Sequence, residues 1–172
     1  MDTKALRDIS YGLYIVSSQK DGRDAGCVVN TFAQVTSDPL QVSVAINKEN
    51  FTCQAVLDSG IFETVIISEE MPIEVIRLFG FRSSATIDKF ENLEVGVSEA
   101  GLKYLKDNTT ARFSASVKQT LDLGSHVLFV GEVQDAEALS EETPLTYANY
   151  HTIKGGKTPP KASSYIPPEP KA

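Results

Sequence analysis

Alternation of apolar and polar residues in two segments limits the fold of this chain more than any other feature. Apolar side chains occupy every second position from Leu40 to Ile46, and the segment from Phe113 to Leu121 follows nearly the same pattern. A period of two is typical of a β-strand with one buried face. The helical patterns between such segments are irregularly placed, unlike the repeated strand–helix rhythm of a parallel sheet. We therefore predict a mainly β protein, an antiparallel β-barrel of roughly six or seven strands with inserted short helices.

A further strand is expected from Ser125 to Val133. Its centre, Val127 to Val130, is apolar on both faces. Such a strand needs cover on the inside and on the outside, because either face would otherwise expose apolar surface to water. In a β-barrel, the outer cover is often a helix or a second subunit.

Turn and cap signals place the remaining elements. Asn50 or Thr52 suits the N-cap of a helix over Phe51–Ser59, and Gly60 suits its end. The other expected elements are a helical lead-in over residues 2–9, strands over Tyr11–Ser18 and Ile61–Ser68, a hairpin turn at Asp21-Gly22, a helix over Pro72–Phe79 ended by Gly80, a polar loop over 81–92 and a short helix or turn over Ser98–Asp107.

The chain divides into one domain and a tail. With 172 residues in total, residues 1–153 suffice for a single domain with a real core. From Lys154 onward the sequence is rich in Gly, Lys and Pro, and five of the eight prolines lie there. We expect residues 154–172 to form an extended tail without helix or strand.

The composition excludes several classes of protein. A hydrophobic content of 41% indicates a globular chain, and no apolar run approaches the ~20 residues of a membrane span. The formal net charge of -7 makes nucleic acid an unsuitable partner. The N-terminus lacks a signal-peptide pattern, so the expected location is the cytoplasm.

Metal-binding and disulfide-forming residues are sparse. Cys27 and Cys53 are too few for a disulfide framework and form no Cys-x-x-Cys pair. His126 and His151 stand apart, without the spacing of zinc ligands. We therefore expect no metal site.

The segment Asn30–Ser37 follows Cys27–Val29 and is expected to continue the same strand. Its polar side chains lie on both faces of that strand. Buried polar groups are costly unless they find partners. The partner could be a neighbouring backbone, water or a ligand rich in donors and acceptors. The competing interpretation is a solvated strand end that runs into a turn at Asp38-Pro39.

Three other polar groups stand at expected strand or helix ends: Asn47–Thr52, Phe81–Ser84 and Gly124–His126. The first leads into a helix, whose N-terminal N–H groups favour anions. Each group also has a purely structural explanation, because Lys48 suits a solvated turn and Arg82 suits a surface ion pair with Glu69 or Glu70.

Together these segments resemble the flavin reductase-like family of FMN-binding split barrels, in particular the flavin-reductase domain of high-molecular-weight rubredoxins and flavoredoxins. The resemblance extends from Met1 to about Tyr165. The matching segments are Ile9–Ser18, Cys27–Thr31, Gln34–Ser37, Asn47-Lys48, Phe79–Ser83, Asp88–Phe90 and Gly131–Val133.

The resemblance implies a homodimer that binds FMN at the boundary between its subunits. Lys48 and Arg82 would supply charge-assisted hydrogen bonds to the phosphate. His126, the candidate catalytic residue, would lie toward the nicotinamide side of the flavin. The implied cofactor-binding residues are Asn30, Thr31, Gln34, Val35, Thr36 and Ser37 around the ring, and Asn47, Lys48, Asn50, Thr52, Cys53, Arg82 and Ser83 around the ribityl chain and phosphate.

The implied reaction is hydride transfer from NADH or NADPH to bound flavin, with electrons passing on to free flavin or a partner protein such as rubredoxin. No side chain need act as a nucleophile, which agrees with the lack of a triad or carboxylate pair. Because no further cysteines follow the domain, we expect the acceptor to be a separate molecule.

Two departures from the family pattern leave other functions open. Cys53 stands where close relatives have His, either as a plain helix residue or as a thiol near the flavin. The run Arg82–Thr86 lacks the second arginine of the family pattern, which would weaken nucleotide binding by ~1–3 kcal/mol. The alternatives are an FMN electron carrier with little pyridine-nucleotide activity, or a barrel that has lost flavin and serves as a binding module.

Overall fold

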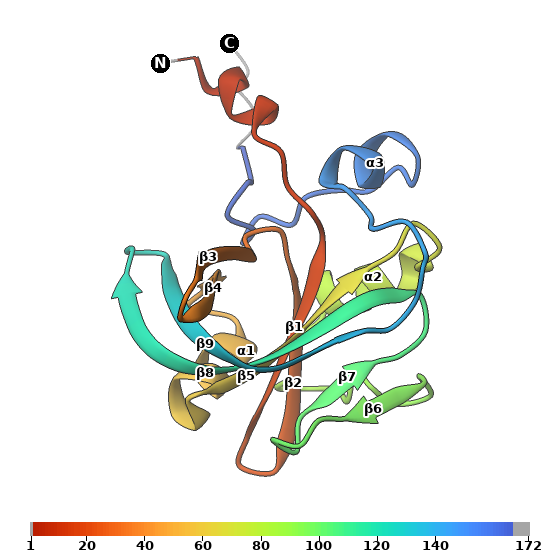
Figure 1. The fold of residues 1–172 in the computed structure, drawn as a ribbon. Coiled ribbons are helices and arrows are strands. Elements are labelled where there is room, and N and C mark those ends of the chain that lie inside the picture. The colour runs from red at the N-terminus through yellow and green to blue at the C-terminus, as the bar shows by residue number, and fades with distance from the viewer. Residues whose placement is uncertain (1, 167–172) are drawn as a thin grey trace.

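The computed structural model describes residues 2–166 (Figure 1). Seven strands form one antiparallel sheet in the order β2-β1-β5-β8-β9-β4-β3, and two short strands form a separate hairpin. The predicted mainly β split barrel is confirmed. The strands of the large sheet are β1 (Tyr14–Lys20), β2 (Arg23–Val29), β3 (Ala33–Ser37), β4 (Leu40–Asn47), β5 (Ile61–Ile67), β8 (Thr109–Asp122) and β9 (His126–Ala138).

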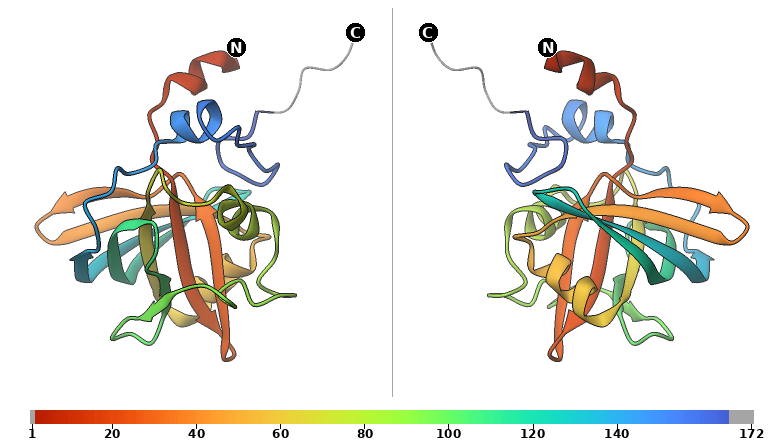
Figure 2. Two further views of the ribbon diagram at one scale, coloured as in Figure 1. Left: turned by 90° about the vertical axis from the view of Figure 1, so that its right-hand side faces the viewer. Right: turned by 90° about the vertical axis from the view of Figure 1, so that its left-hand side faces the viewer.

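Short helices lie before, between and after the strands. They are the 3-10 helix η1 (Thr3–Asp8) and the α-helices α1 (Phe51–Ser59), α2 (Ile73–Phe81) and α3 (Tyr147–Thr152). The N-terminal segment with η1 projects from the barrel on the same side as α3 (Figures 1 and 2). No helix within residues 2–166 combines the length and the apolar character needed to cross a bilayer.

The alternating segments become strands with one face in the core. In β4, Val42, Val44 and Ile46 are buried while the residues between them are only half buried. Strand β4 pairs with β9 from Gln41 to Asn47. On β9 the same alternation appears, with Phe129 fully buried. The outward face of this predicted doubly apolar strand is only half covered within one chain.

Two apolar cores lie on opposite faces of β1. Val16 packs inside the barrel with Phe129, while the preceding Ile15 faces a second core beneath α2 that contains Phe79. Each fully buried side chain of this size contributes about 1.5–3 kcal/mol to stability. Strand β1 is therefore covered on both sides, and α2 is fixed against the sheet by its apolar stripe.

Helix α1 has the predicted ends. Asn50 is the N-cap, with its side-chain oxygen accepting a hydrogen bond from the Thr52 N–H at 3.1 Å. Gly60 ends the helix with a φ of 71°, a conformation that favours glycine. Helix α2 differs from the prediction, because it continues through Gly80 to Phe81. Gly80 does not have a positive φ, and therefore does not stop the helix.

The predicted continuous strand from Cys27 through Ser37 is wrong. Strand β2 ends at Val29, and β3 begins at Ala33 on the opposite edge of the sheet. Thr31 explains the break, because its hydroxyl donates to the Ala45 carbonyl at 2.8 Å and accepts from the Ala45 N–H at 3.1 Å. These bonds fasten the chain that leaves β2 to the backbone of β4, 14 positions further along the sequence.

The expected short helix or turn over Ser98–Asp107 is confirmed only in its first part, because residues 99–101 form a turn whereas Lys103–Leu105 is a strand. Strand β6 (Val95–Val97) pairs with β7 (Lys103–Leu105) in a hairpin whose turn includes Gly101 at a φ of 80°. Leu102 and Leu105 are both buried, and Leu105 packs in the second core together with Ile15 and Phe79. Tertiary packing of these leucines, rather than a local period of two, determines this short hairpin.

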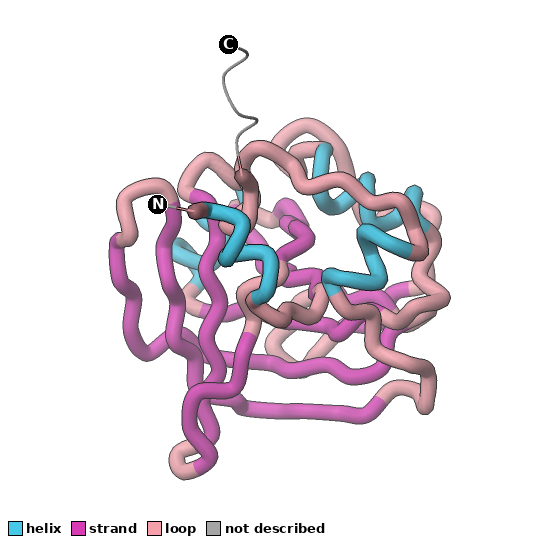
Figure 3. Tube along the Cα trace, turned by 90° about the horizontal axis from the view of Figure 1, so that it is seen from above, coloured by secondary structure: helices cyan, strands magenta, loops and turns pink. Residues whose placement is uncertain are grey.

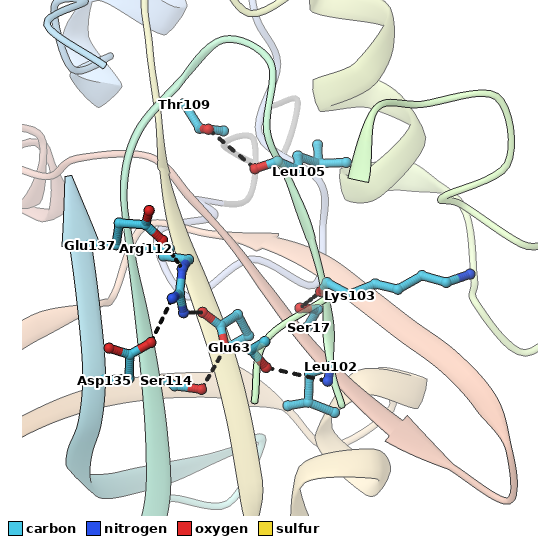
Figure 4. A network of polar contacts seen from close by, with 11 residues as sticks. Ser17, Glu63, Leu102, Lys103, Leu105, Thr109, Arg112, Ser114, Asp135 and Glu137 are labelled. Atoms are coloured by element: carbon cyan, nitrogen blue, oxygen red, sulfur yellow. Dashed lines mark hydrogen bonds and ion pairs between the residues drawn. The ribbon is translucent and has the colours of Figure 1, made fainter. Parts of the chain in front are cut away.

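A buried ionic cluster joins the central strands β5, β8 and β9 (Figure 4). The Arg112 guanidinium contacts Glu63 at 3.2 Å, Asp135 at 2.5 Å and Glu137 at 2.8 Å. Ser114 donates a second hydrogen bond to Glu63 at 2.6 Å. Burial opposes the charge of Arg112, but the hydrogen bonds to its three carboxylate partners outweigh it and raise the pKa. The cluster is a structural crosslink between strands.

The described part of the tail, residues 154–166, returns over one end of the barrel near α2 (Figure 2). Figure 3 looks down on this end, with η1 and the loops nearest the viewer. The tail contains no helix or strand, as predicted, but it bends through turns in which Ala162 N–H donates to Pro159 and Tyr165 N–H donates to Ala162. Residues 167–172 lie outside the described residues.

Candidate functional site

A cavity of about 80 Å³, lined mainly by apolar side chains with several polar ones among them, lies where the tail crosses the barrel end. Its walls come from the ends of β2 and β4, the start of α1, the end of α2 and the tail. Ligand pockets usually measure about 300–1,000 Å³, so the tail nearly fills this one. The side chains that matter for its chemistry are Asn30, Asn47, Asn50, Phe81, His126 and Tyr147. Four predicted site residues, three amides and one imidazole, are thereby brought together.

Asn30 is buried at the pocket wall and is held by the tail. Its Nδ2 donates to Ser164 Oγ at 2.9 Å, and its Oδ1 accepts from Ser163 Oγ at 3.0 Å. The neighbouring Thr31 is used structurally, through Ala45. The polar character of Asn30 and Thr31 is therefore satisfied by the chain itself, as one interpretation of this segment allowed.

Asn47 and Lys48 end β4 beside the same cavity. The Asn47 side chain donates to the Lys161 carbonyl at 3.2 Å. The Lys48 ammonium forms an ion pair with Asp122 at 2.5 Å, and this pairing lowers the pKa of Asp122. Lys48 directly follows Asn47, which lines the cavity, and a ligand anion there would compete with Asp122 for the Lys48 ammonium.

The start of α1 has the features of an anion site. Its first turn contains no acidic residue, so the positive end of the helix dipole is not neutralised. Asn50 lines the cavity, and two residues later the fully buried Thr52 Oγ1 has no hydrogen-bond partner among the described residues. An unpartnered buried hydroxyl costs about 1–3 kcal/mol, and such a group marks a place where a partner is missing.

Of the two thiols, Cys27 rather than Cys53 lines the cavity. Cys53 is fully buried in the core inside the barrel. Burial, reinforced by the proximity of Cys27, raises the pKa of Cys53 to about 11. Burial also raises the pKa of Cys27, and the nearby charge of Lys89 offsets this increase only in part. The Thr52 hydroxyl lies close to the Cys27 thiol and lowers its pKa, but the two groups do not form a hydrogen bond of normal geometry. Both thiols are protonated and unreactive at neutral pH.

The remaining predicted ring and phosphate residues do not line this cavity. Gln34, Val35, Thr36 and Ser37 are exposed on the edge strand β3. Arg82 and Ser83 are exposed just after α2, whose last residue, Phe81, does line the cavity. The expected ion pair between Arg82 and Glu69 or Glu70 is not among the ion pairs of the described residues.

His126 begins β9 and faces the cavity beside the tail. Its Nδ1 lies 2.8 Å from Ser125 Oγ. Burial lowers the pKa of His126, and a hydrogen bond with the Lys161 backbone offsets this only in part. The imidazole is therefore neutral at pH 7, which makes it a donor or acceptor rather than a fixed charge.

Sequence reasoning missed the contribution of the tail and of α3. Tyr147 Oη accepts a hydrogen bond from Ser164 at 3.0 Å and also contacts the Thr158 hydroxyl. Lys161 pairs with Glu49 at 2.5 Å. The hydroxyls between the prolines of the tail did not signal these contacts, because the same composition is typical of a disordered linker whose hydroxyls bond to water.

The site as a whole supplies amides, hydroxyls, a helix N-terminus and two cations, Lys48 and Lys161, each already paired with a carboxylate. It contains no activated nucleophile, and residues 2–166 hold no group of His, Cys, Asp or Glu side chains suited to a metal ion. Such a donor set suits a polar, anion-bearing small molecule that brings its own chemistry. The fold is a split barrel, and the side chains at the end of the barrel are suited to a ligand of this kind.

Comparison with known proteins identifies the family. The flavin reductase like domain matches residues 6–155. An Archaeoglobus fulgidus protein named ferric-chelate reductase (NAD(P)H) is 45% identical over 166 residues, covering 96% of this chain and 98% of the relative. The high molecular weight rubredoxin of Moorella thermoacetica is 44% identical over 165 residues, covering 96% of this chain and 72% of that protein.

A solved structure supports the same assignment at the level of the fold. The flavoredoxin of Methanosarcina acetivorans superposes with a TM-score of 0.69 at 20% identity, over 78% of this chain and 74% of that chain. The protein belongs to the flavin reductase-like family of oxidoreductases, and the predicted resemblance to rubredoxin-linked and flavoredoxin-type members is confirmed.

Proposed function

We propose that this protein binds FMN and uses it to oxidise NADH or NADPH, with free flavin, a ferric chelate or a protein such as rubredoxin as the acceptor. Family membership supports the reaction class, and the names of two relatives support the nicotinamide donor and the acceptors. The chemistry that bound FMN supplies is hydride acceptance and electron delivery. This chain supplies binding and orientation.

The start of α1 is the observation that supports FMN most directly. A phosphate there would meet the positive end of the helix dipole, the Lys48 ammonium and the unpartnered Thr52 hydroxyl. Asn50 already lines the cavity at this point. The residues present therefore fit a phosphorylated ligand. Asn30, Asn47 and His126 would face the remainder of the molecule, with His126 as the neutral side chain on the nicotinamide side.

We propose that the working form is a homodimer with FMN at the boundary between subunits. Within one chain, β3 is exposed along its length and Leu121 and Leu123 are 57% and 52% exposed at the β8–β9 turn. Leu128 on β9 lies opposite Leu121 and Ala45, so the outward side of these strands is partly apolar. A second subunit covering this side would bring Gln34–Ser37 next to a flavin ring.

A flavin electron carrier is the second candidate function. Arg82 is exposed rather than directed into the cavity, and Lys48 is already paired with Asp122. A site with few free cations would bind FMN more readily than it would bind a second, highly charged nucleotide.

Flavin titration followed by NADH addition tests both functions. We expect the purified protein to shift the visible absorption of FMN on binding and then to consume NADH or NADPH when an acceptor is added. Tight FMN binding without NAD(P)H turnover would favour the carrier. Failure to retain FMN would contradict both. Sedimentation analysis of the FMN-loaded protein should give a dimer, and a stable monomer would contradict the proposed boundary site.

A further inference from the structure

A buried lysine connects two walls of the cavity without lining the cavity itself. Lys89 is 1% exposed, and its Nζ donates hydrogen bonds to the Gly26 carbonyl at 2.7 Å and to the Phe79 carbonyl at 3.0 Å. Among the described residues, no carboxylate forms an ion pair with it. The hydrogen bonds of the Lys89 ammonium among the described residues go to two backbone carbonyls.

Each of these carbonyls belongs to the residue that immediately precedes a cavity wall. Gly26 precedes Cys27–Asn30, the end of β2 that lines the cavity, and Phe79 precedes Gly80 and Phe81, the end of α2 that also lines it. The ammonium therefore sets the separation between the strand wall and the helix wall. The Phe79 ring lies 5.6 Å from the ammonium and adds a cation–π contact.

Ser84 also bonds to the backbone of Gly26 in β2. Its hydroxyl accepts from the Gly26 N–H at 3.0 Å and donates to the Gly26 carbonyl at 3.3 Å. A side chain at Gly26 would approach the Phe79 ring to 2.7 Å, so strand and helix are as close here as a glycine allows. Ser84 follows Arg82 and Ser83 directly. The loop with these two predicted phosphate ligands is therefore fixed to β2 through the Gly26 backbone.

This arrangement is not what stability alone would favour. A buried cation without a carboxylate partner is costly, and apolar side chains of similar volume usually serve a core better. The cost is visible in the pKa of Lys89, which burial lowers to about 8. A methionine would fill the same space without this cost, but it would leave the two carbonyls unjoined.

We propose that Lys89 and Ser84, which together we call the Gly26 anchor, are positioning residues for the flavin site. The anchor holds the β2 wall, the α2 wall and the Arg82–Ser83 loop at the spacing that FMN requires. The inference rests on the proposed function, because it assigns a role toward FMN. Neither side chain lines the cavity, and both act through backbone.

The test compares Lys89→Met with Arg112→Met. Both variants remove a buried cation, but Arg112 belongs to the ionic cluster between β5, β8 and β9 and does not line the cavity. FMN affinity is measured by quenching of flavin fluorescence at a temperature where urea unfolding shows each variant to be folded. We expect the Kd of Lys89→Met to rise about tenfold or more, and that of Arg112→Met to stay within about twofold of wild type.

A second measurement needs no flavin. Amide hydrogen exchange of the apo-protein should be about fivefold faster in Lys89→Met for peptides spanning residues 26–30 and 79–82, with no change in β8. If Lys89→Met does not fold, Ser84→Ala tests the same anchor, with an expected rise in Kd of about threefold.

The outcomes separate the two proposals. A wild-type protein that does not bind FMN overturns the proposed function and, with it, the anchor. A wild-type protein that binds FMN overturns the anchor alone if Lys89→Met, or Ser84→Ala in its place, has unchanged affinity. An equal loss of affinity in Lys89→Met and Arg112→Met also overturns the anchor, because it would indicate general destabilisation.

Discussion

Asn30 and Ser164 are 134 positions apart in the sequence, yet the Asn30 amide donates a hydrogen bond to the Ser164 hydroxyl at 2.9 Å. With the neighbouring Ser163 bond, this contact fastens the tail over the cavity at the end of β2. The tail is therefore a wall of the candidate site, and movement of the tail is expected to control access to it.

Loosening the tail should accelerate FMN release. The double change Ser163→Ala and Ser164→Ala removes both bonds to Asn30 and the Ser164 bond to Tyr147. At about 1 kcal/mol per hydrogen bond, we expect the dissociation rate to rise by about 10- to 100-fold, measured by stopped-flow fluorescence. Ser140→Ala is the control, because among the described residues the Ser140 hydroxyl bonds to the Thr109 carbonyl and the Glu142 N–H, and Ser140 does not line the cavity. An unchanged rate in the double variant would mean that the tail does not retain the ligand.

Releasing Lys48 from its carboxylate partner should tighten FMN binding. Asp122→Asn removes the negative charge that pairs with the Lys48 ammonium. The freed cation would then meet the phosphate without competition, and we expect the Kd to fall about three- to tenfold at low salt. The gain should disappear when Lys48→Ala is added to Asp122→Asn. Titration of FMN at low and at high ionic strength measures both effects, and a weaker affinity in Asp122→Asn would refute the competition.

Thr52 and Thr64 form a matched pair for testing the anion site. Each has a fully buried hydroxyl without a partner among the described residues, so Thr→Val at either position should stabilise the apo-protein by about 1 kcal/mol. Only Thr52→Val should raise the Kd for FMN, by about tenfold. Urea unfolding and flavin titration of both variants give the comparison. Equal affinities in the two variants would exclude the Thr52 hydroxyl as a phosphate ligand.

The buried Lys89 should make stability depend on pH above neutrality. Burial lowers its pKa from 10.5 to about 8 in the folded chain, so between these values the unfolded chain binds more protons and the free energy of unfolding rises with pH. Wild type should therefore gain up to about 3 kcal/mol relative to Lys89→Met between pH 8 and pH 10.5. Urea unfolding across this pH range measures the free energy of unfolding of both proteins. Tyrosine titration affects both proteins equally, so it does not contribute to the difference between them. A constant difference would indicate that the Lys89 pKa is not lowered.

Local features of the sequence were sufficient to predict most of the strands and helix α1. The alternation in Leu40–Ile46 predicts β4 because a strand turns successive side chains to opposite faces. Asn50 and Gly60 predict the ends of α1 because capping involves only neighbouring backbone groups. The residues of the candidate site were harder to predict. Asn30, Asn47 and His126 meet at the cavity, whereas Gln34–Ser37 lie on an exposed edge and Arg82 lies outside it.

The amino-acid sequence by itself determined the class of fold and the family, because periodicity, caps and ordered motifs are properties of neighbouring residues. Only the tertiary structure decided which polar groups share a cavity. It separated Asn30 from β3 through the bond between Thr31 and Ala45, brought the tail onto Asn30, and buried Lys89 between Gly26 and Phe79. Each of these contacts joins residues distant in sequence, and the partner of a hydrogen-bonding group is chosen by the packing of the whole chain.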